Sequence, residues 1–445
     1  MGSKGEKEKA SRLDELQDEK SASQKQRSKV NNNINQSRSS AEKVEQNTSE
    51  TRPTDEQNSP KTNEENHGSG DKSKGDKIMN NMVEEAEKAI SQGIYPQLAS
   101  QGSSGTYFVF DTQENTIAVF KPKSEEPYAE QNPRWVKFFQ RIFCACCWGR
   151  KCLIPNNGYL SEVGASVADD MLGLQVVPRT KLVQLSSASF CYSKRDLKKE
   201  PLPPKIGSFQ TFVHGYKDAG VWLDIWAKKD PPLDPDLQEE FLILFQKMIV
   251  LDYVIRNTDR NNVNWLVKYE GYETSSPSLK IAVIDNGLAF PYKHPDNWRK
   301  YPFYWAHLPD AKKPFTKDIV ELVLPKINSP QFVFNLTRAL QDIFQNDPDF
   351  DKEKFHGQMR VLRGQLHNLR LALAACSQGS SVSPSELVKY PTKDIVAVSQ
   401  LYRPSAQRIG KKHECDLVTQ VPNYYTWETA FKVKIVTTNT CFHRF

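Results

Sequence analysis

The sequence predicts an α+β protein of two lobes, a strand-rich lobe followed by a helix-rich lobe, with a disordered tail in front of them. Three observations support this prediction. Residues 1–80 contain no Phe, Tyr or Trp. Residues 81–218 contain short strand-like runs, whereas residues 219–377 contain long runs with a helical period. A chain of 445 residues is also long enough for about two or three domains.

The tail is expected to span residues 1–80. Lys, Glu, Ser, Asn and Gln dominate it, it carries 15 basic and 15 acidic residues, and the first aromatic residue of the chain is Tyr95. Such a segment buries too little apolar surface to offset its ordering entropy. The net charge of +6 therefore belongs to the rest of the chain, and this mild excess suits an anionic membrane surface. No basic run has the interleaved aromatic residues of a nucleic-acid platform, so we expect no nucleic-acid partner.

The strand-rich lobe should span residues 81–218, with a cysteine-rich insertion at about 134–152. Its elements follow from hydrophobic periodicity and turn residues. In chain order we expect helix 81–91, a turn at 101–105, strands 106–111 and 116–121, a basic-aromatic helix 134–147, helix 159–174, and strands 182–186 and 208–213.

The helix-rich lobe should span residues 219–377. A long helix at 234–256 has a broad apolar face, and apolar strands follow at 265–267 and 280–284. Further helices are expected at 316–326, 331–345 and 351–376. Residues 378–445 are polar and contain Ser and Pro, so we expect a mostly irregular region. No run of 18 apolar residues occurs, so no transmembrane helix is expected.

Three polar residues of this lobe have the order and spacing of a phosphoryl-transfer site. Asp259 and Asn264 follow the long helix, and Asp285 ends the second apolar strand. Phosphoryl transfer needs a carboxylate at the attacking hydroxyl, and an amide and a second carboxylate to hold magnesium on the phosphates. We therefore interpret Asp259 as the catalytic base and Asn264 and Asp285 as metal ligands. Each motif alone could be a turn, because Asp-Asn-Gly is a good turn former.

The front of the strand-rich lobe adds a nucleotide-binding pattern. The run Gly102, Ser103, Ser104, Gly105 and Thr106 can offer backbone N–H groups to a phosphate. Lys121 ends an apolar strand, as the lysine that contacts nucleotide phosphates does in kinases. Taken alone, a plain turn and an exposed lysine are the better interpretations. Together with Asp259, Asn264 and Asp285 they predict a two-lobe, protein-kinase-like fold with ATP in the cleft.

At this point the chain resembles the type II phosphatidylinositol 4-kinases of the PI3/PI4-kinase superfamily. The resemblance covers residues 91–373. It includes QGSSGTYFV at 101–109, GRKCLIPNNGYLSEVGAS at 149–166, VLDYVIRNTDR at 250–260 and AVIDNGLAFPYKHPDNWRKYPFYWA at 282–306. It implies transfer of phosphate from ATP, with magnesium, to the 4-hydroxyl of phosphatidylinositol. The expected location is the cytosolic face of Golgi (trans-Golgi network), endosomal and plasma membranes.

The resemblance also implies roles for individual residues. The Gly turn and Lys121 would hold the ATP phosphates, and Glu162 is the candidate acidic partner of Lys121. The hinge beside the adenine would be formed by Gln210, Thr211, Phe212 and Val213. The residues expected near the inositol headgroup are Glu126, Pro127 and Tyr128. A protein kinase is disfavoured, because the His-Arg-Asp and Asp-Phe-Gly forms are absent.

Membrane attachment is expected at two places. Cys144, Cys146 and Cys147 end the basic-aromatic segment and suit S-palmitoylation by a palmitoyltransferase. The alternative for these cysteines is a zinc site, but no second ligand pair follows. Aromatic residues with neighbouring Arg and Lys would dip into the headgroup layer, although each could equally pack in the core. They are Trp135, Phe138, Phe139, Trp298, Tyr301, Phe303, Tyr304 and Trp305.

The chain departs from the family pattern inside the catalytic loop. Asn261 replaces a usual glycine, and Val263 replaces a usual acid beside the metal site. These departures motivate a second hypothesis, a catalytically weak, palmitoylated membrane scaffold that keeps the kinase fold. His307 stands where the family commonly has Trp, and the end of the chain differs from the usual aromatic ending.

Overall fold

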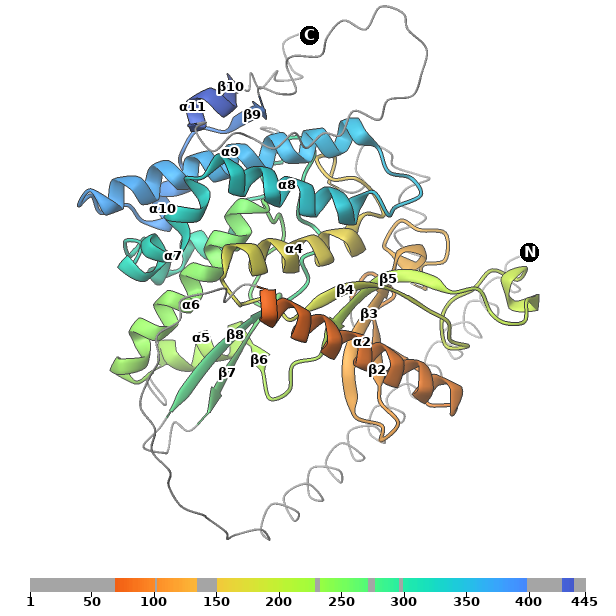
Figure 1. Ribbon diagram of the computed structural model, residues 1–445. Coiled ribbons are helices and arrows are strands. Elements are labelled where there is room, and N and C mark those ends of the chain that lie inside the picture. Colours follow the sequence, from red (N-terminus) through yellow and green to blue (C-terminus); the bar gives the residue numbers. More distant parts are fainter. Residues whose placement is uncertain are drawn as a thin grey trace, which may run out of the picture. The chain divides into compact units, whose positions relative to one another are not determined.

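The computed structural model describes residues 69–100, 102–133, 150–228, 233–270, 277–295, 299–397 and 426–435. These residues fold as two lobes, and Figure 1 shows the sheet of the first lobe on one side of α4 and the helices of the second on the other. This is the two-lobe α+β arrangement of the protein kinases, as the sequence predicts. The predicted tail lies outside the described residues up to residue 68.

The first lobe contains an antiparallel sheet in the order β1-β2-β3-β5-β4. Its strands are β1 (Gln97–Leu98), β2 (Tyr107–Phe110), β3 (Thr116–Pro122), β4 (Thr180–Leu185) and β5 (Lys205–Thr211). Buried and half-buried positions alternate in β2, and buried positions alternate along β3 from Ala118, as expected for a sheet with one face against a core. This alternation turns Tyr107, Ala118 and Phe120 into the core of the lobe.

Helix α2 (Ser69–Ser91) covers one face of this sheet and corrects the predicted start of the folded part. We expected the helix to begin at residue 81. Instead it begins at Ser69, and Met79, which is 3% exposed, packs with Ala86 in the core of the lobe. Small or flexible apolar side chains hold the helix there, so the lack of aromatic residues is a poor guide to its start.

Helix α4 (Gly158–Leu172) lies between the sheet and the helical lobe. It is buried on most sides, and Gly164 allows the rings of Phe290 and Phe344 to approach its backbone. The lobes are also joined by an ion pair: Nζ of Lys123, just after β3, lies 2.7 Å from Oδ1 of Asp347. The hydroxyl of Tyr159 donates to Oδ2 of the same aspartate at 3.0 Å. Helix α4 therefore contacts both lobes.

The second lobe is built around α6 (Pro235–Val254), which Asp234 caps by accepting the Asp236 N–H. The other long helices are α5 (Ala219–Lys228), α7 (Lys317–Ile327), α8 (Pro330–Phe344) and α9 (Lys352–Ser377). A second sheet, β6 (Lys217–Asp218), β7 (Trp265–Glu270) and β8 (Ser278–Val283), packs on α6. Short 3-10 turns occur at η1 (Lys123–Glu125), η2 (Asp196–Lys198), η3 (Tyr304–His307) and η4 (Pro309–Lys312).

The prediction that residues 378–445 are mostly irregular is wrong for the part that the structure describes. Strand β9 (Lys393–Ala397) pairs antiparallel with β10 (Phe431–Ile435), next to the short helices α10 (Pro384–Leu387) and α11 (Trp427–Ala430). Trp427 and Phe431 are buried in the core of the helical lobe. Apolar contacts made across a long sequence separation order this region, and local composition does not report them. No described helix is long and apolar enough to cross a bilayer.

Candidate active site

The glycine turn at residues 102–106 connects β1 to β2, and hydrogen bonds to Glu125 and Asn132 hold it in place. Gly102 has a φ of 107°, a conformation that favours glycine. The amide of Gly105 donates to the carbonyl oxygen of Glu125 at 2.8 Å, and Asn132 Nδ2 donates to the Ser103 carbonyl oxygen at 3.1 Å. The hydroxyls of Ser104 and Thr106 lie 3.2 Å apart. The predicted turn is therefore present, and it is held in one position.

The reason for this rigidity is a buried carboxylate that sequence reasoning missed. Glu125 is fully buried and accepts hydrogen bonds from Tyr107 Oη at 2.6 Å, Lys205 Nζ at 2.7 Å and the Cys191 amide at 3.0 Å. A Cβ atom on Gly105 would lie 2.4 Å from Oε2 of Glu125. Only glycine fits there without moving the carboxylate, so Gly105 serves close packing.

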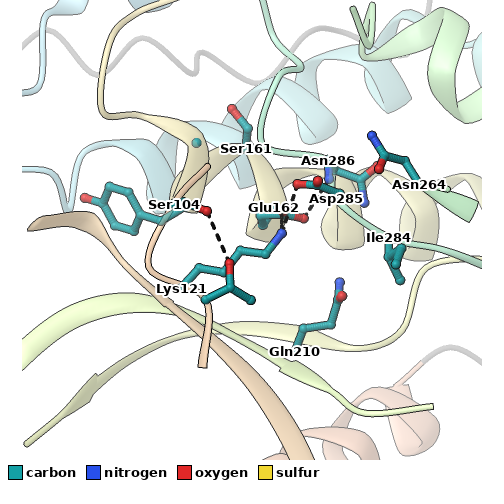
Figure 2. A network of polar contacts seen from close by, with 12 residues as sticks. Ser104, Lys121, Ser161, Glu162, Gln210, Asn264, Ile284, Asp285 and Asn286 are labelled. Carbon is teal, nitrogen blue, oxygen red and sulfur yellow. Dashed lines mark hydrogen bonds and ion pairs between the residues drawn. The ribbon is translucent and has the colours of Figure 1, made fainter. Parts of the chain in front are cut away.

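Lys121 lies on β3 with its ammonium between two carboxylates (Figure 2). Its Nζ is 2.5 Å from Oε1 of Glu162 and 3.0 Å from Oδ1 of Asp285. Burial alone would lower the pKa of Lys121, but the negative charges of Asp285 and Glu162 outweigh it and raise the pKa. The predicted pairing of Lys121 with Glu162 is confirmed. The structure also joins Lys121 to Asp285 of the second lobe.

Asp285 follows β8 in a constrained conformation. Its φ is 53°, in the left-handed region that non-glycine residues rarely adopt, and its side chain is 56% exposed. Lys121 lowers the pKa of Asp285, which favours the charged carboxylate. The next amide, Asn286 N–H, donates to Oε2 of Glu162 at 2.8 Å. Glu162 therefore fixes both Lys121 and the loop that carries Asp285.

Asp259 and Asn264 lie on the loop between α6 and β7. Asn264 Nδ2 donates to the carbonyl oxygen of Asp259 at 2.8 Å, which ties the two residues together. The Asp259 carboxylate is 30% exposed, and its Oδ1 lies 2.9 Å from Nη2 of Arg150. Because the amide nitrogen of Asn264 is engaged, its Oδ1 is the atom suited to a cation.

Arg260 holds this loop in place and was not predicted. It is 2% exposed, and Nε donates to both carboxylate oxygens of Asp252 at 3.1 Å. Its other nitrogens donate to the carbonyl oxygens of Asn264 and Ile284 and to Oδ1 of Asn286. One guanidinium therefore joins α6, the Asp259 loop and the Asp285 loop. An acid inside the apolar helix sequence around Asp252 was the available signal for such a partner.

The oxygen atoms of Asn264 and Asp285 suit magnesium, which takes one or two carboxylates together with phosphate oxygens. No cluster of three or more His, Cys, Asp or Glu side chains within the described residues could hold a metal ion by itself. A site completed by the phosphates of ATP does not require such a cluster. The donor set therefore fits the predicted metal.

The predicted hinge residues lie at the end of β5, next to β3. The amide of Thr211 donates to the Arg179 carbonyl oxygen, and that of Phe212 to the Ile117 carbonyl oxygen, both at 2.9 Å. Gln210 Nε2 donates to Oγ1 of Thr180 at 2.9 Å. These donors are engaged within the lobe, so an adenine ring would have to meet other backbone groups of residues 210–213.

Glu126 directly follows η1 in the chain, and its carboxylate contacts the N-terminus of α4; Pro127 and Tyr128 come next and are half-buried. The Glu126 carboxylate is 7% exposed and accepts the amides of Tyr159 at 2.7 Å and Gly158 at 3.1 Å. Burial raises its pKa to about 7, although both hydrogen bonds act in the opposite direction. The structure thus places Glu126 as a helix cap, and the predicted headgroup contact of these three residues stays a prediction.

The predicted membrane contacts of Phe303 and Trp305 are wrong. They are 5% and 1% exposed, and their rings stack with centroids 4.8 Å apart in the core of the helical lobe. An aromatic run does not by itself distinguish a buried cluster from an exposed one. Tyr304 is 52% exposed, and Tyr301 is half-buried beneath Arg150. Trp135, Phe138, Phe139, Trp298, Cys144, Cys146 and Cys147 lie outside the described residues.

Comparison with known proteins agrees with a kinase site in this position. The family described as "Phosphatidylinositol 3- and 4-kinase" matches residues 102–350. The zebrafish (Danio rerio) phosphatidylinositol 4-kinase type 2-alpha is 47% identical over 342 residues, which are 70% of this chain and 75% of that protein. The chicken (Gallus gallus) phosphatidylinositol 4-kinase type 2-beta is 48% identical over 344 residues, 70% of each chain.

Among solved structures, the Helicobacter pylori proinflammatory kinase CtkA is similar over 64% of this chain and 95% of that chain, with a TM-score of 0.36 and 13% identity. The family match spans the glycine turn, Lys121, the Asp259 loop and Asp285. The chain therefore belongs to the phosphatidylinositol 3- and 4-kinase family, and within it to the type 2 phosphatidylinositol 4-kinases.

Proposed function

We propose that this protein is a membrane-associated lipid kinase that transfers the γ-phosphate of ATP to the 4-hydroxyl of phosphatidylinositol, giving phosphatidylinositol 4-phosphate. The observation that carries the proposal is the Lys121 ammonium between Glu162 and Asp285, next to the loop of Asp259 and Asn264. The names of the relatives, which are type 2 phosphatidylinositol 4-kinases, support the choice of lipid.

Each side chain of the site has a separate role in the reaction. Asp259 orients the attacking 4-hydroxyl and receives its proton as the new phosphorus–oxygen bond forms. The bond between the γ-phosphorus and the ADP oxygen breaks. Lys121 and the N–H groups of the glycine turn, apart from that of Gly105, restrain the phosphates and offset their charge. Asn264 and Asp285 would hold magnesium, which neutralises phosphate charge when it is bound.

Membrane attachment is part of the proposal. Thiols at Cys144, Cys146 and Cys147, after a basic-aromatic segment, suit palmitoylation by a palmitoyltransferase. Two acyl chains anchor stably because each buried methylene contributes about 0.8 kcal/mol. We propose the cytosolic face of Golgi, endosomal and plasma membranes as the location, on the basis of the family resemblance. Exposed Tyr304 is the described aromatic residue best suited to touch the lipid surface.

The test is transfer of radiolabelled γ-phosphate from ATP to phosphatidylinositol in detergent–lipid micelles with magnesium. The expected product is phosphatidylinositol 4-phosphate, identified by its headgroup isomer. Asp259→Asn is expected to abolish transfer while leaving ATP binding intact. ATP binding without transfer by the wild-type protein would contradict the proposal and favour the scaffold hypothesis, for which Val263 is the motivating residue.

A further inference from the structure

Arg150 contacts the catalytic loop through both ends of its guanidinium group. Nη1 donates to the carbonyl oxygen of Thr258 at 2.7 Å, and Nη2 lies 2.9 Å from Oδ1 of Asp259. Thr258 and Arg150 are 108 residues apart in sequence. Because the guanidinium is planar and rigid, two bonds to consecutive residues fix the direction of the carboxylate as well as its distance.

The face of the same guanidinium covers the ring of Tyr301, with 4.5 Å from Cζ to the ring centroid. This contact is a cation–π interaction. Arg256 holds the same stretch of chain: its Nη2 donates to the carbonyl oxygens of Lys300 and Tyr301 at 3.0 and 3.2 Å, and its guanidinium lies 4.5 Å from the Phe303 centroid. Arg150 therefore touches the Asp259 loop with its edge and the segment after Asp285 with its face.

The partial exposure of the Arg150–Asp259 ion pair indicates how the pair affects catalysis and how it affects stability. The side chains of Arg150 and Asp259 are 21% and 30% exposed. Ion pairs with access to solvent contribute little to folding. A misplacement of about 1 Å in a catalytic group, in contrast, can reduce turnover by about 100-fold. Loss of Arg150 should therefore affect catalysis more than stability.

We propose that Arg150 is a positioning residue for phosphoryl transfer. It orients the Asp259 carboxylate. Because Arg150 also contacts Tyr301, this orientation depends on the packing of residues 299–305. The inference deepens the proposed function and rests on Asp259 being the group that meets the attacking hydroxyl.

The experiment compares Arg150→Ala, Arg150→Lys and Tyr301→Ala in steady-state transfer to phosphatidylinositol in micelles. The expected kcat of Arg150→Ala is about 100-fold below the wild-type value, with the KM for ATP changed less than about two-fold, because the ATP-contacting groups are untouched. Added guanidinium ion should restore part of the kcat of Arg150→Ala. Arg150→Lys keeps the charge but loses the planar pair of donors, so its kcat should be about ten-fold below the wild-type value. The kcat of Tyr301→Ala should also be lower than the wild-type value.

Arg338→Ala, an exposed arginine on α8, is the matched control and should keep wild-type kinetics with or without guanidinium. A kcat for Arg150→Ala within about two-fold of wild type would overturn the inference. So would a loss that guanidinium does not restore in a protein with unchanged melting temperature. If Arg150→Ala fails to fold, Arg150→Lys decides, and wild-type kcat in that variant refutes a positioning role. If the wild-type protein itself transfers no phosphate, the proposed function fails instead.

Discussion

The ammonium of Lys121 lies 2.5 Å from Oε1 of Glu162, although 41 residues separate them in the sequence. The other carboxylate oxygen of Glu162 accepts the N–H of Asn286. One side chain on α4 therefore fixes the lysine of the first lobe and the metal-side loop of the second. Any shift of α4 would therefore move both groups together.

Replacing Glu162 by Gln should reduce kcat/KM for ATP by about 100-fold, because Lys121 loses its charged partner and misplacement in an active site has costs of this size. Steady-state kinetics with ATP and phosphatidylinositol measures it. Glu130→Gln, at an exposed position in the first lobe, is the control and should be silent. Wild-type kinetics in Glu162→Gln would show that Asp285 alone positions Lys121.

Replacing Asp252 by Asn should lower the free energy of unfolding by about 3–5 kcal/mol, because it leaves the buried Arg260 guanidinium without its anion. Chemical denaturation followed by fluorescence measures the change. Glu240→Gln, exposed on the same helix, should change it by less than about 0.5 kcal/mol. A loss below about 1 kcal/mol for Asp252→Asn would mean that the three oxygen acceptors of Arg260 satisfy it without the carboxylate.

Replacing Gly105 by Ala should raise the dissociation constant for ATP by about ten-fold, which corresponds to about 1.4 kcal/mol of binding. The new methyl group would lie 2.4 Å from Oε2 and 2.7 Å from Cβ of Glu125. Glu125 cannot withdraw, since Tyr107, Lys205 and Cys191 hold it, so the turn must move. Isothermal titration with ATP provides the measurement. Gly220→Ala, whose Cβ meets only ordinary contacts, should bind ATP like the wild type.

The contribution of Glu126 to stability should fall as pH rises through 7, because Glu126 has a folded-state pKa of about 7 against an ordinary value of 4.5. The folded state holds this proton more tightly, so the contribution is complete below pH 4.5 and lost as pH rises through 7. A difference of this size is worth at most about 3 kcal/mol. Asp169, with a pKa also raised by burial to about 7, acts in the same direction.

The check compares unfolding free energies at pH 5 and pH 8. Glu126→Gln should reduce the loss of stability between these two pH values, and adding Asp169→Asn should reduce it further. An unchanged slope in the double variant would mean that neither carboxyl group takes up a proton in this range.

Replacing Val263 by Asp should leave stability unchanged, because the Val263 side chain is 56% exposed. If the wild-type protein is already an active kinase, we expect its turnover to change by less than about three-fold, since the groups of Asp259, Asn264 and Asp285 stay in place. Turnover numbers in micelles measure this. A sharp rise in the variant would instead indicate that the wild-type protein is a catalytically weak scaffold.

Several residues of the site could be predicted from the sequence, because they lie in short motifs with a characteristic order and spacing. Asp259, Asn264 and Asp285 were predictable from two short motifs, and the family pattern led to Glu162. Arg150 and Arg260 were not, since their partners lie far away or on another element: the contact of Arg150 with Thr258 spans 108 residues.

The wrong predictions also concern contacts between residues that lie far apart in the sequence. Phe303 and Trp305 look like an interfacial aromatic run, but the decision between surface and core depends on which helices lie opposite them. Strand β9 lacks a visible partner in its neighbourhood, because β10 lies beyond the segment 398–425. Periodicity predicts an element, whereas its burial and pairing depend on the rest of the chain.

The left-handed backbone of Asp285 has a consequence for how this protein tolerates change. Glycine would adopt a φ of 53° without strain, whereas a non-glycine residue in a sparsely populated region of this kind is held at a cost of about 1–3 kcal/mol. Natural selection for heat resistance alone would therefore favour replacing Asp285 by glycine. A laboratory screen that rewards thermostability without requiring turnover should accumulate substitutions at Asp285 and lose the enzyme while it improves the fold.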